Sequence, residues 1–118
     1  MKVHLMFVFC LFLLSACVKS KSGSDIIASD KMGSVIFDMN VAEEFVSIYV
    51  AKDSSKDKKA ELNKEYQKIY LLYEITEQQF KNSYDYYKAH PGAYKIVIDS
   101  LNAKAQRRRE DLYRMPNS

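Results

Sequence analysis

Residues 30–52, DKMGSVIFDMNVAEEFVSIYVAK, decide the fold. Apolar residues recur in this stretch every three or four positions, which is the spacing of one face of an α-helix. That first row consists of Met32, Val35, Ile36, Met39, Ala42, Val46, Tyr49 and Val50. A second row, roughly opposite, consists of Phe37, Val41, Phe45 and Ile48. A helix that is apolar on two sides must be covered on two sides. We therefore expect it at the centre of a bundle, in preference to a position where the second row docks on a partner.

Glu43 interrupts the first apolar row of this helix, between Met39 and Val46. A buried carboxylate is costly unless it is paired or hydrogen bonded. Three interpretations stay open: a residue at the edge of the row that reaches solvent, a carboxylate satisfied by tyrosine hydroxyls or an arginine, or a group with a ligand-binding or catalytic role. Glu43 and Glu44 point about 100° apart on a helix, so they do not form a converging acid–base pair.

The sequence after this helix predicts three more helices. Asp53–Asp57 is a polar hinge, and a second helix follows over about residues 57–73. Thr76 and Gln79 then have the spacing of a capping box, in which each residue caps a backbone N–H at the start of a helix. We therefore expect the second helix to stop at about Glu74 and the third helix to start almost at once.

The third helix is expected to bury Phe80, Tyr84 and Tyr87. It ends at His90, which we interpret as a turn residue or N-cap, because a proline follows and proline favours the first helical position. The fourth helix should run over about residues 91–113. Its buried row consists of Tyr94, Val97, Ile98, Leu101, Ala105 and Leu112. The run Arg107–Arg109 extends past this core, as a solvated helix end or as a docking patch for anionic headgroups or an acidic partner.

The segment before the helices predicts where the protein resides. An apolar run from Leu5 to Leu14 is too short to span a bilayer, which takes about 20 residues, but it fits the core of a signal peptide. Leu14-Ser15-Ala16-Cys17 then resembles the bacterial lipobox, in which the cysteine is lipidated and becomes the first mature residue. An uncleaved anchor helix and a secreted protein with a free Cys17 are the alternatives.

These patterns together predict an all-α protein, a small bundle of about four helices after a cleaved lipoprotein signal peptide and a flexible tether. The expected segments are a signal peptide, a lipidated cysteine with a Ser/Gly/Lys-rich tether, a helical domain and a C-terminal tail. Their respective boundaries are residues 1–16, 17–28, 29–114 and 115–118.

The sequence offers no catalytic, metal-binding or cofactor-binding pattern. No cysteine follows Cys17, and His90 is the single histidine after it. The usual nucleophile–base pairs, thiolate metal sites and Gly-rich phosphate loops are therefore missing from the pattern. The formal net charge of +3 gives no basic face for nucleic acid. We expect a non-enzymatic protein that binds the membrane through Cys17 and docks on an envelope protein.

Tyrosine is the unusual residue, with nine Tyr and no Trp. Tyrosine combines a large apolar body with a hydroxyl that needs a partner. An alternative function follows, a small-molecule-binding lipoprotein, although these rings can equally form core. The tyrosines expected to line the pocket are Tyr70, Tyr84, Tyr86 and Tyr87. Residues considered for interaction, on the first helix, are Phe37, Val41, Glu43, Phe45 and Ile48.

Several spaced residues resemble a family of small lipoproteins from Bacteroidota, the domain of unknown function 4296. The most specific part is Gln79-Phe80-x-x-Ser83-x-x-Tyr86-Tyr87, and the likeness covers about residues 29–106. Other matching residues are Lys31, Met32, Asp38, Ala42, Glu43, Tyr70, Tyr73, Ile75, Thr76, Tyr94 and Leu101. The resemblance implies an all-helical domain on a lipid anchor, with no assigned activity. Val97 departs from it, since the family often has a second tyrosine there.

The resemblance also bears on location. Surface-displayed lipoproteins of such bacteria tend to carry acidic residues directly after the lipidated cysteine. This chain instead has Val18-Lys19-Ser20-Lys21, and its first acid is Asp25. We therefore expect the outer membrane and its periplasmic face, in preference to display on the cell surface.

Overall fold

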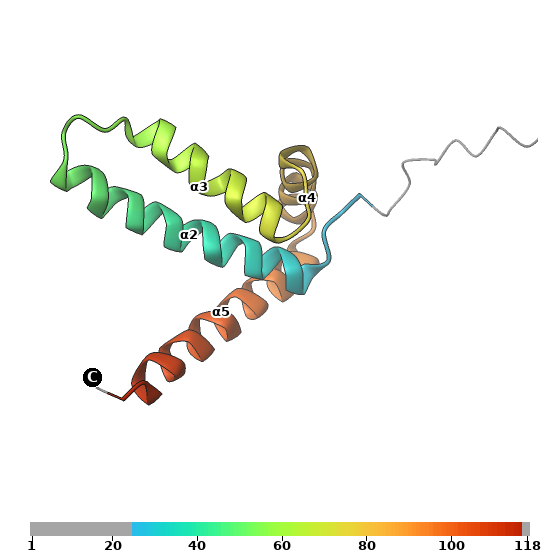
Figure 1. Cartoon of the computed structure of the whole chain (residues 1–118). Helices are drawn as coiled ribbons and strands as arrows, with labels where there is room; N and C mark the ends of the chain where they lie inside the picture. The colour runs from blue at the N-terminus through green and yellow to red at the C-terminus, as the bar shows by residue number, and fades with distance from the viewer. Residues whose placement is uncertain (1–24, 117–118) are drawn as a thin grey trace, which may run out of the picture.

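The structure is a computed structural model that describes residues 25–116, and these residues form four α-helices (Figure 1). Their bounds are Ser29–Lys52 for α2, Lys58–Leu72 for α3, Glu77–Ala89 for α4 and Pro91–Arg114 for α5. Residues 25–116 contain no strand. The predicted all-α bundle of about four helices is therefore confirmed. The lipobox, including Cys17, lies outside the described residues.

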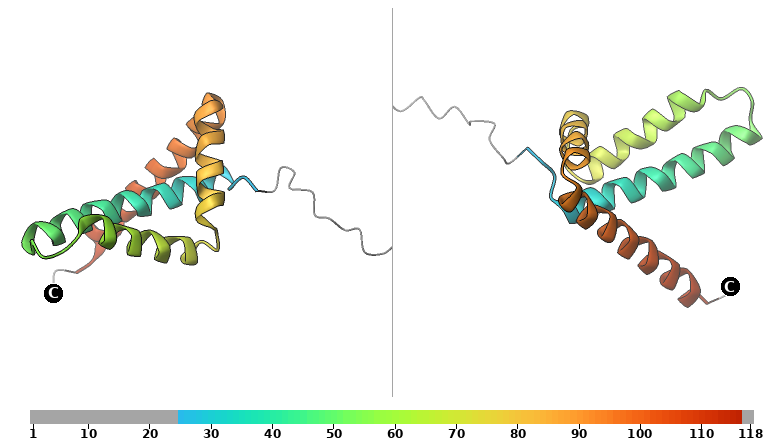
Figure 2. Two further views of the ribbon diagram at one scale, coloured as in Figure 1. Left: turned by 90° about the horizontal axis from the view of Figure 1, so that it is seen from above. Right: turned by 180° about the vertical axis from the view of Figure 1, so that it is seen from behind.

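Helix α2 takes the central position, because both α3 and α5 pack against it. α2 and α3 run antiparallel, α4 crosses the end of that pair, and α5 leaves α2 at an angle (Figures 1 and 2). The crossing of α2 and α5 is close at Gly33. A Cβ atom placed there would lie only 2.6 Å from the carbonyl oxygen of Val97 and 2.9 Å from the backbone nitrogen of Leu101. Glycine is required at this position by the approach of α5.

Short polar side chains end the helical structure between α2 and α3, where the hinge was predicted. The backbone N–H and hydroxyl of Ser55 donate to one carboxylate oxygen of Asp53, at 3.0 and 2.6 Å. These bonds lower the pKa of the Asp53 carboxyl. Asp57 is the N-cap of α3, and its carboxylate accepts from the backbone N–H of Lys59 at 3.0 Å. The hinge therefore supplies its own caps.

The corner between α3 and α4 is built by two capping motifs in succession. Glu74 has a φ of 52°, a left-handed conformation that glycine adopts more readily. The N–H of Ile75 then donates to the carbonyl of Tyr70 at 3.0 Å, which closes a Schellman motif. Thr76 and Gln79 form the predicted capping box, with both reciprocal bonds at 3.0 Å. The direction of α4 is thus set by the backbone bond that ends α3 and by side-chain caps on the backbone at the start of α4.

Two apolar clusters of buried residues flank α2. The cluster between α2 and α3 contains Val35, Met39, Ala42, Ile69 and Tyr70. The cluster between α2, α4 and α5 contains Ile27, Met32, Tyr87 and Val97. Ile75 and Phe80 pack against both clusters. The corner therefore joins the two halves of the core.

The segment directly before α2 belongs to the folded domain, which corrects the expected boundary. Ile27, placed in the tether by the sequence, is buried. Its N–H donates to the hydroxyl of Ser83 at 2.8 Å, and the hydroxyl of Tyr87 donates to its carbonyl at 2.6 Å. Ala28 is the N-cap of α2 and makes no side-chain cap bond, and the Ser29 hydroxyl lies 3.2 Å from that of Tyr87.

Several residues expected in apolar rows are exposed. They are Tyr49 on α2, Tyr84 on α4 and Leu112 on α5. Leu112 is exposed because its helical row continues past the last residue of α5 that a neighbouring helix covers. From Gln106 to Pro116 every residue of α5 and its end is exposed. Arg107–Arg109 therefore lies beyond the core, as the sequence predicts.

Candidate functional site

One hollow of about 220 Å³ lies between α2, α3 and α4. It is lined by Ile36, Met39, Asn40, Glu43, Tyr66, Phe80 and Tyr84. Polar groups are contributed by Asn40, Glu43 and Tyr66, and apolar side chains and aromatic rings make up the rest. The α3–α4 corner creates this hollow, because it turns Phe80 and Tyr84 towards the face of α2 that carries Glu43.

Glu43 is the acid of this hollow, and it accepts a hydrogen bond from the hydroxyl of Tyr66. The residue is also exposed to solvent. Two of the three interpretations of Glu43 thus hold together: it reaches solvent, and a tyrosine hydroxyl satisfies it. Burial, followed by the bond to Glu43 and its charge, raises the pKa of Tyr66. Tyr66 therefore stays a neutral hydroxyl donor to Glu43 at neutral pH.

The aromatic wall of the hollow comes from α4. The rings of Phe80 and Tyr84 are stacked, with their centroids 6.0 Å apart. The ammonium of Lys88 lies over the outer part of this wall, 4.8 Å from the centroid of Tyr84. Tyr70 lies behind the wall, buried in the core with its ring 6.0 Å from that of Phe80. The pKa of Tyr70 is raised, and burial is the largest cause, ahead of the nearby charges.

The other two predicted pocket tyrosines lie elsewhere. Tyr86 and Tyr87 line a separate hollow of about 490 Å³ with the segment before α2. Tyr86 stacks on His90, with the ring centroids 4.1 Å apart, and Tyr87 is buried. The Nδ1 atom of His90 lies 2.7 Å from the carbonyl oxygen of Tyr86, so His90 is a turn residue, as expected. The structure therefore divides the four tyrosines: Tyr84 faces one hollow, Tyr86 and Tyr87 face another, and Tyr70 packs in the core.

The second apolar row of α2 is covered along only half of its length. Phe37 is buried and Val41 is half-buried, whereas Phe45 is 60% exposed and Ile48 is 50% exposed. A shallow hollow of about 280 Å³ lies on this side, between α2 and α3. Its lining residues are Asp38, Val41, Ala42, Phe45, Glu65, Ile69 and Leu72. Leu72 is 71% exposed. We call Val41, Phe45, Ile48 and Leu72 the open face.

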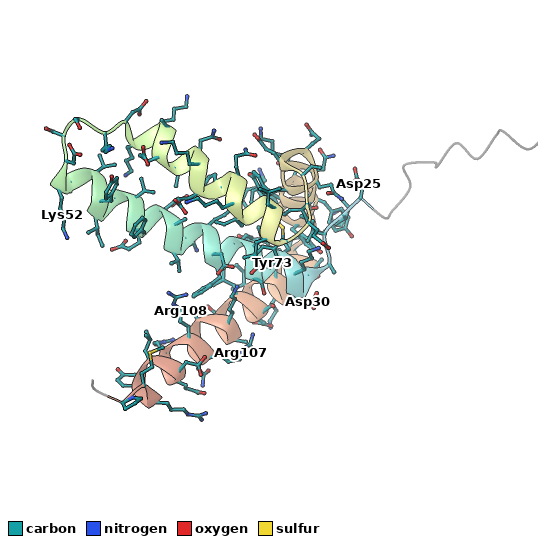
Figure 3. The ribbon with its side chains drawn as sticks, viewed as in Figure 1. Asp25, Asp30, Lys52, Tyr73, Arg107 and Arg108 are labelled. Carbon is teal, nitrogen blue, oxygen red and sulfur yellow. The ribbon has the colours of Figure 1, made fainter. Side chains whose placement is uncertain are left out.

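A polar cluster that the sequence did not indicate joins α2, α3 and α5. The ammonium of Lys104 lies 2.9 Å from the carboxylate of Asp38 and 2.6 Å from the hydroxyl of Tyr73. Tyr73 in turn donates to Asp38 at 2.6 Å. Figure 3 labels Tyr73 at this junction. Asp38 and Tyr73 occur in the motif that carries the family resemblance, but no spacing along the chain connects them with Lys104.

Charge and burial act on this cluster in opposite directions. Burial lowers the pKa of Lys104, but the bonds to Asp38 and Tyr73 and the charge of Asp38 outweigh it and raise the pKa overall. Burial and the bond to Asp38 raise the pKa of Tyr73. The cluster therefore holds an ammonium, a neutral phenol and a carboxylate, and each donor has an acceptor.

The described residues also limit the chemistry at these surfaces. Within residues 25–116, no group of three or more His, Cys, Asp or Glu side chains is arranged to hold a metal ion. None of the four helices is both long and apolar enough to cross a bilayer. The surfaces comprise an acid-bearing aromatic hollow, an apolar open face and a half-buried polar junction.

The fold and these surfaces define a small all-α domain of four helices. Residues 24–111 match the family model described as "Domain of unknown function (DUF4296)", and the chain belongs to that family. No curated protein and no solved structure matches the chain.

Proposed function

We propose that this protein is a lipid-anchored, non-catalytic interaction module of the cell envelope, attached through Cys17 and facing the periplasm from the outer membrane. The lipobox-like Leu14–Cys17 supports the anchor, and the Lys19/Lys21 context supports the periplasmic side. Two or three acyl chains hold a protein firmly at a membrane. The single observation that carries the interaction role is the open face.

The open face supports an interaction role because its apolar side chains are exposed on two neighbouring helices, α2 and α3. Phe45 and Ile48 belong to the central helix, and Phe45 and Leu72 line a shallow hollow that is mostly apolar. Single exposed apolar residues are common, but a contiguous patch with a concave centre is typical of interaction sites. Acidic residues at its edge, among them Glu65, resemble the polar rim of such sites.

The anchor is tested by Cys17→Ser in the full-length protein. We expect this variant to move from the membrane fraction to the soluble fraction and to lose the mass of its acyl chains. Cys10→Ser is the matched control, because Cys10 lies within the apolar run before the cleavage site, and it should leave both readouts unchanged. A Cys17→Ser protein that stays with membranes at an unchanged processed mass would refute the anchor.

The interaction role is tested by crosslinking in intact cells, followed by mass spectrometry of the adducts. We expect adducts of the wild-type protein that disappear in the double variant Phe45→Ser/Ile48→Ser. Asn63→Ser is the control, because Asn63 is exposed on α3 half a helical turn away from Glu65 and the open face. Adducts that persist unchanged in the double variant would remove the open face from the proposal.

A second candidate function is binding of a small organic cation in the hollow at Glu43. The observation in its favour is a carboxylate beside aromatic rings, since ammonium groups bind both to carboxylates and to ring faces. The volume suits a fragment rather than a drug-sized molecule. Titration with n-butylammonium, followed by NMR shifts, should give a Kd on the order of 1 mM. Glu43→Gln should abolish the shifts and Glu44→Gln should keep them. Equal shifts in both variants would exclude the hollow as the binding site of the cation.

A further inference from the structure

Two surfaces of this chain have apolar side chains without a covering helix. The first is the open face of α2 and α3. The second is the end of α5, residues 105–116, which we call the α5 arm. Leu112 and Met115 on the arm are 58% and 61% exposed. In the views of Figures 1 and 2 the arm projects away from the α2–α3 pair.

The arm cannot cover the open face of its own chain. α5 is one continuous helix to Arg114, without glycine or proline after Gly92. Its direction is fixed by the close crossing at Gly33 and by the bonds from Lys104 to Asp38 and Tyr73. A helix bends sharply only at such residues or at an inserted group. The two apolar surfaces of one chain therefore stay apart.

The charges of the two surfaces are complementary. Among residues 25–116 all six ion pairs use lysine, so none of the four arginines of the arm has a carboxylate partner there. Arg108 follows Lys104 by four residues and lies on the same side of α5, the side that faces α2 and α3 (Figure 3). On α2, Glu44 is exposed one turn before Ile48 and also has no ion-pair partner in the described part of the chain.

The two surfaces also agree in length. The helical part of the arm, residues 105–114, is about 15 Å long at 1.5 Å per residue. The open face from Val41 to Ile48 is about 12 Å long by the same measure. An α5 arm laid along an open face would place Leu112 near Ile48 and Arg108 within reach of Glu44. One occupant thus supplies both the apolar surface and the positive charge that the open face lacks.

We propose that this occupant is a second copy of the same chain, and that the two copies exchange their α5 arms across a two-fold axis. Each arm then covers the open face of the other copy, which gives a closed, self-complementary dimer. The inference rests on the proposed membrane anchor in one respect. Each contact is small compared with the roughly 800 Å² per partner of a stable complex, and anchoring on one membrane raises the effective concentration.

Disulfide trapping tests the exchange directly, because the only cysteines of the chain are Cys10 and Cys17. Two full-length copies with tags of different size, one carrying Ile48→Cys and the other Leu112→Cys, are produced together and oxidised in membranes. We expect the mixed disulfide dimer to exceed, by at least fivefold, the dimer formed when Asn63→Cys replaces Ile48→Cys. Mass spectrometry of the same samples records whether Cys17 carries lipid.

A charge exchange sharpens the test. Arg108→Glu in both copies should reduce the mixed dimer at least threefold, and adding Glu44→Arg to both copies should restore it. Equal trapping from Ile48 and Asn63, or no trapping while Cys17 is lipidated, would overturn the exchange and leave the anchor intact. Trapping without lipid on Cys17 would keep the exchange and refute the anchor. In a further outcome, a water-soluble maleimide fails to label Leu112→Cys although no mixed dimer forms. That result would mean that a different partner covers the α5 arm, and it would also overturn the proposal.

Discussion

The two ends of α2 carry similar apolar residues but have opposite surroundings. At the N-terminal end, Met32 and Val35 are fully buried, and helices cover both sides. At the C-terminal end, Val46 is buried on the α3 side while Phe45 and Ile48 face solvent. The difference shows that an apolar row predicts which side chains of a helix need to be buried. The direction of the neighbouring helix decides how far along the row they are buried.

The N-terminal end is covered because three kinds of contact meet there. The backbones of α2 and α5 approach at Gly33, Ser83 and Tyr87 hold the segment before α2, and Lys104 joins α5 to Asp38 and Tyr73. Straight helices that cross at an angle separate on either side of the crossing. The C-terminal end is therefore open as a consequence of the tight contact at the other end.

The largest expected effect comes from breaking the crossing with Gly33→Ala. The new methyl group would meet backbone atoms of α5, which cannot move aside as a side chain can. We expect the free energy of unfolding to fall by about 3 kcal/mol, the upper range for overpacking. Gly92→Ala is the control, since its Cβ would have no atom within 4 Å and alanine favours a helix by about 0.8–1.0 kcal/mol. Urea denaturation of the chain from residue 18 measures both, and equal effects would contradict the crossing.

A smaller loss is expected from Ser83→Ala. Ser83 is fully buried, and its hydroxyl accepts from the N–H of Ile27 and donates to the carbonyl of Gln79 at 2.7 Å. Without it, the N–H of Ile27 is buried and unpaired, which costs about 2 kcal/mol. Ser100→Ala removes an exposed bond to the carbonyl of Asp30. It should lower the free energy of unfolding by only a few tenths of the loss expected for Ser83→Ala. The same denaturation experiment checks the pair, and comparable losses would show that Ile27 is not held by Ser83.

The junction of Asp38, Lys104 and Tyr73 predicts an alkaline loss of stability. The pKa of Tyr73 is raised above its ordinary 10.0 and that of Lys104 above 10.5, so the unfolded chain loses these protons first. Their contribution is complete below about pH 10 and declines as pH rises further. Tyr73→Phe should cost about 1 kcal/mol at neutral pH and make the alkaline decline shallower. Tyr113→Phe, in an exposed ring, should leave the profile unchanged. An unaltered slope in Tyr73→Phe would contradict the assigned role of the phenol.

The sequence predicted the helices well because their signals are local. The hinge at residues 53–57, the capping box at Thr76 and the break before Pro91 each depend on neighbouring residues, and the structure confirms all three. The arrangement of side chains depends on distant residues instead. The separation of Tyr84 from Tyr86, and the Asp38–Lys104 pair, follow from how helices cross, which periodicity does not encode. Gly33 was the available signal for the crossing, since a glycine within a helix often marks a close approach.

The smallest effect on stability is expected at the open end, and its dependence on concentration distinguishes the two ends. Ile48→Ala should lower the stability of a dilute chain by less than about 0.5 kcal/mol, because half of the side chain is already exposed. Val46→Ala, two residues earlier and buried, should cost clearly more at every concentration. If the arms are exchanged, the cost of Ile48→Ala grows as the protein is concentrated, since binding of a second copy stabilises the folded state by mass action. Denaturation at two concentrations tenfold or more apart measures this change. A cost for Ile48→Ala that equals that of Val46→Ala in dilute solution would mean that another part of the same chain already covers the open face.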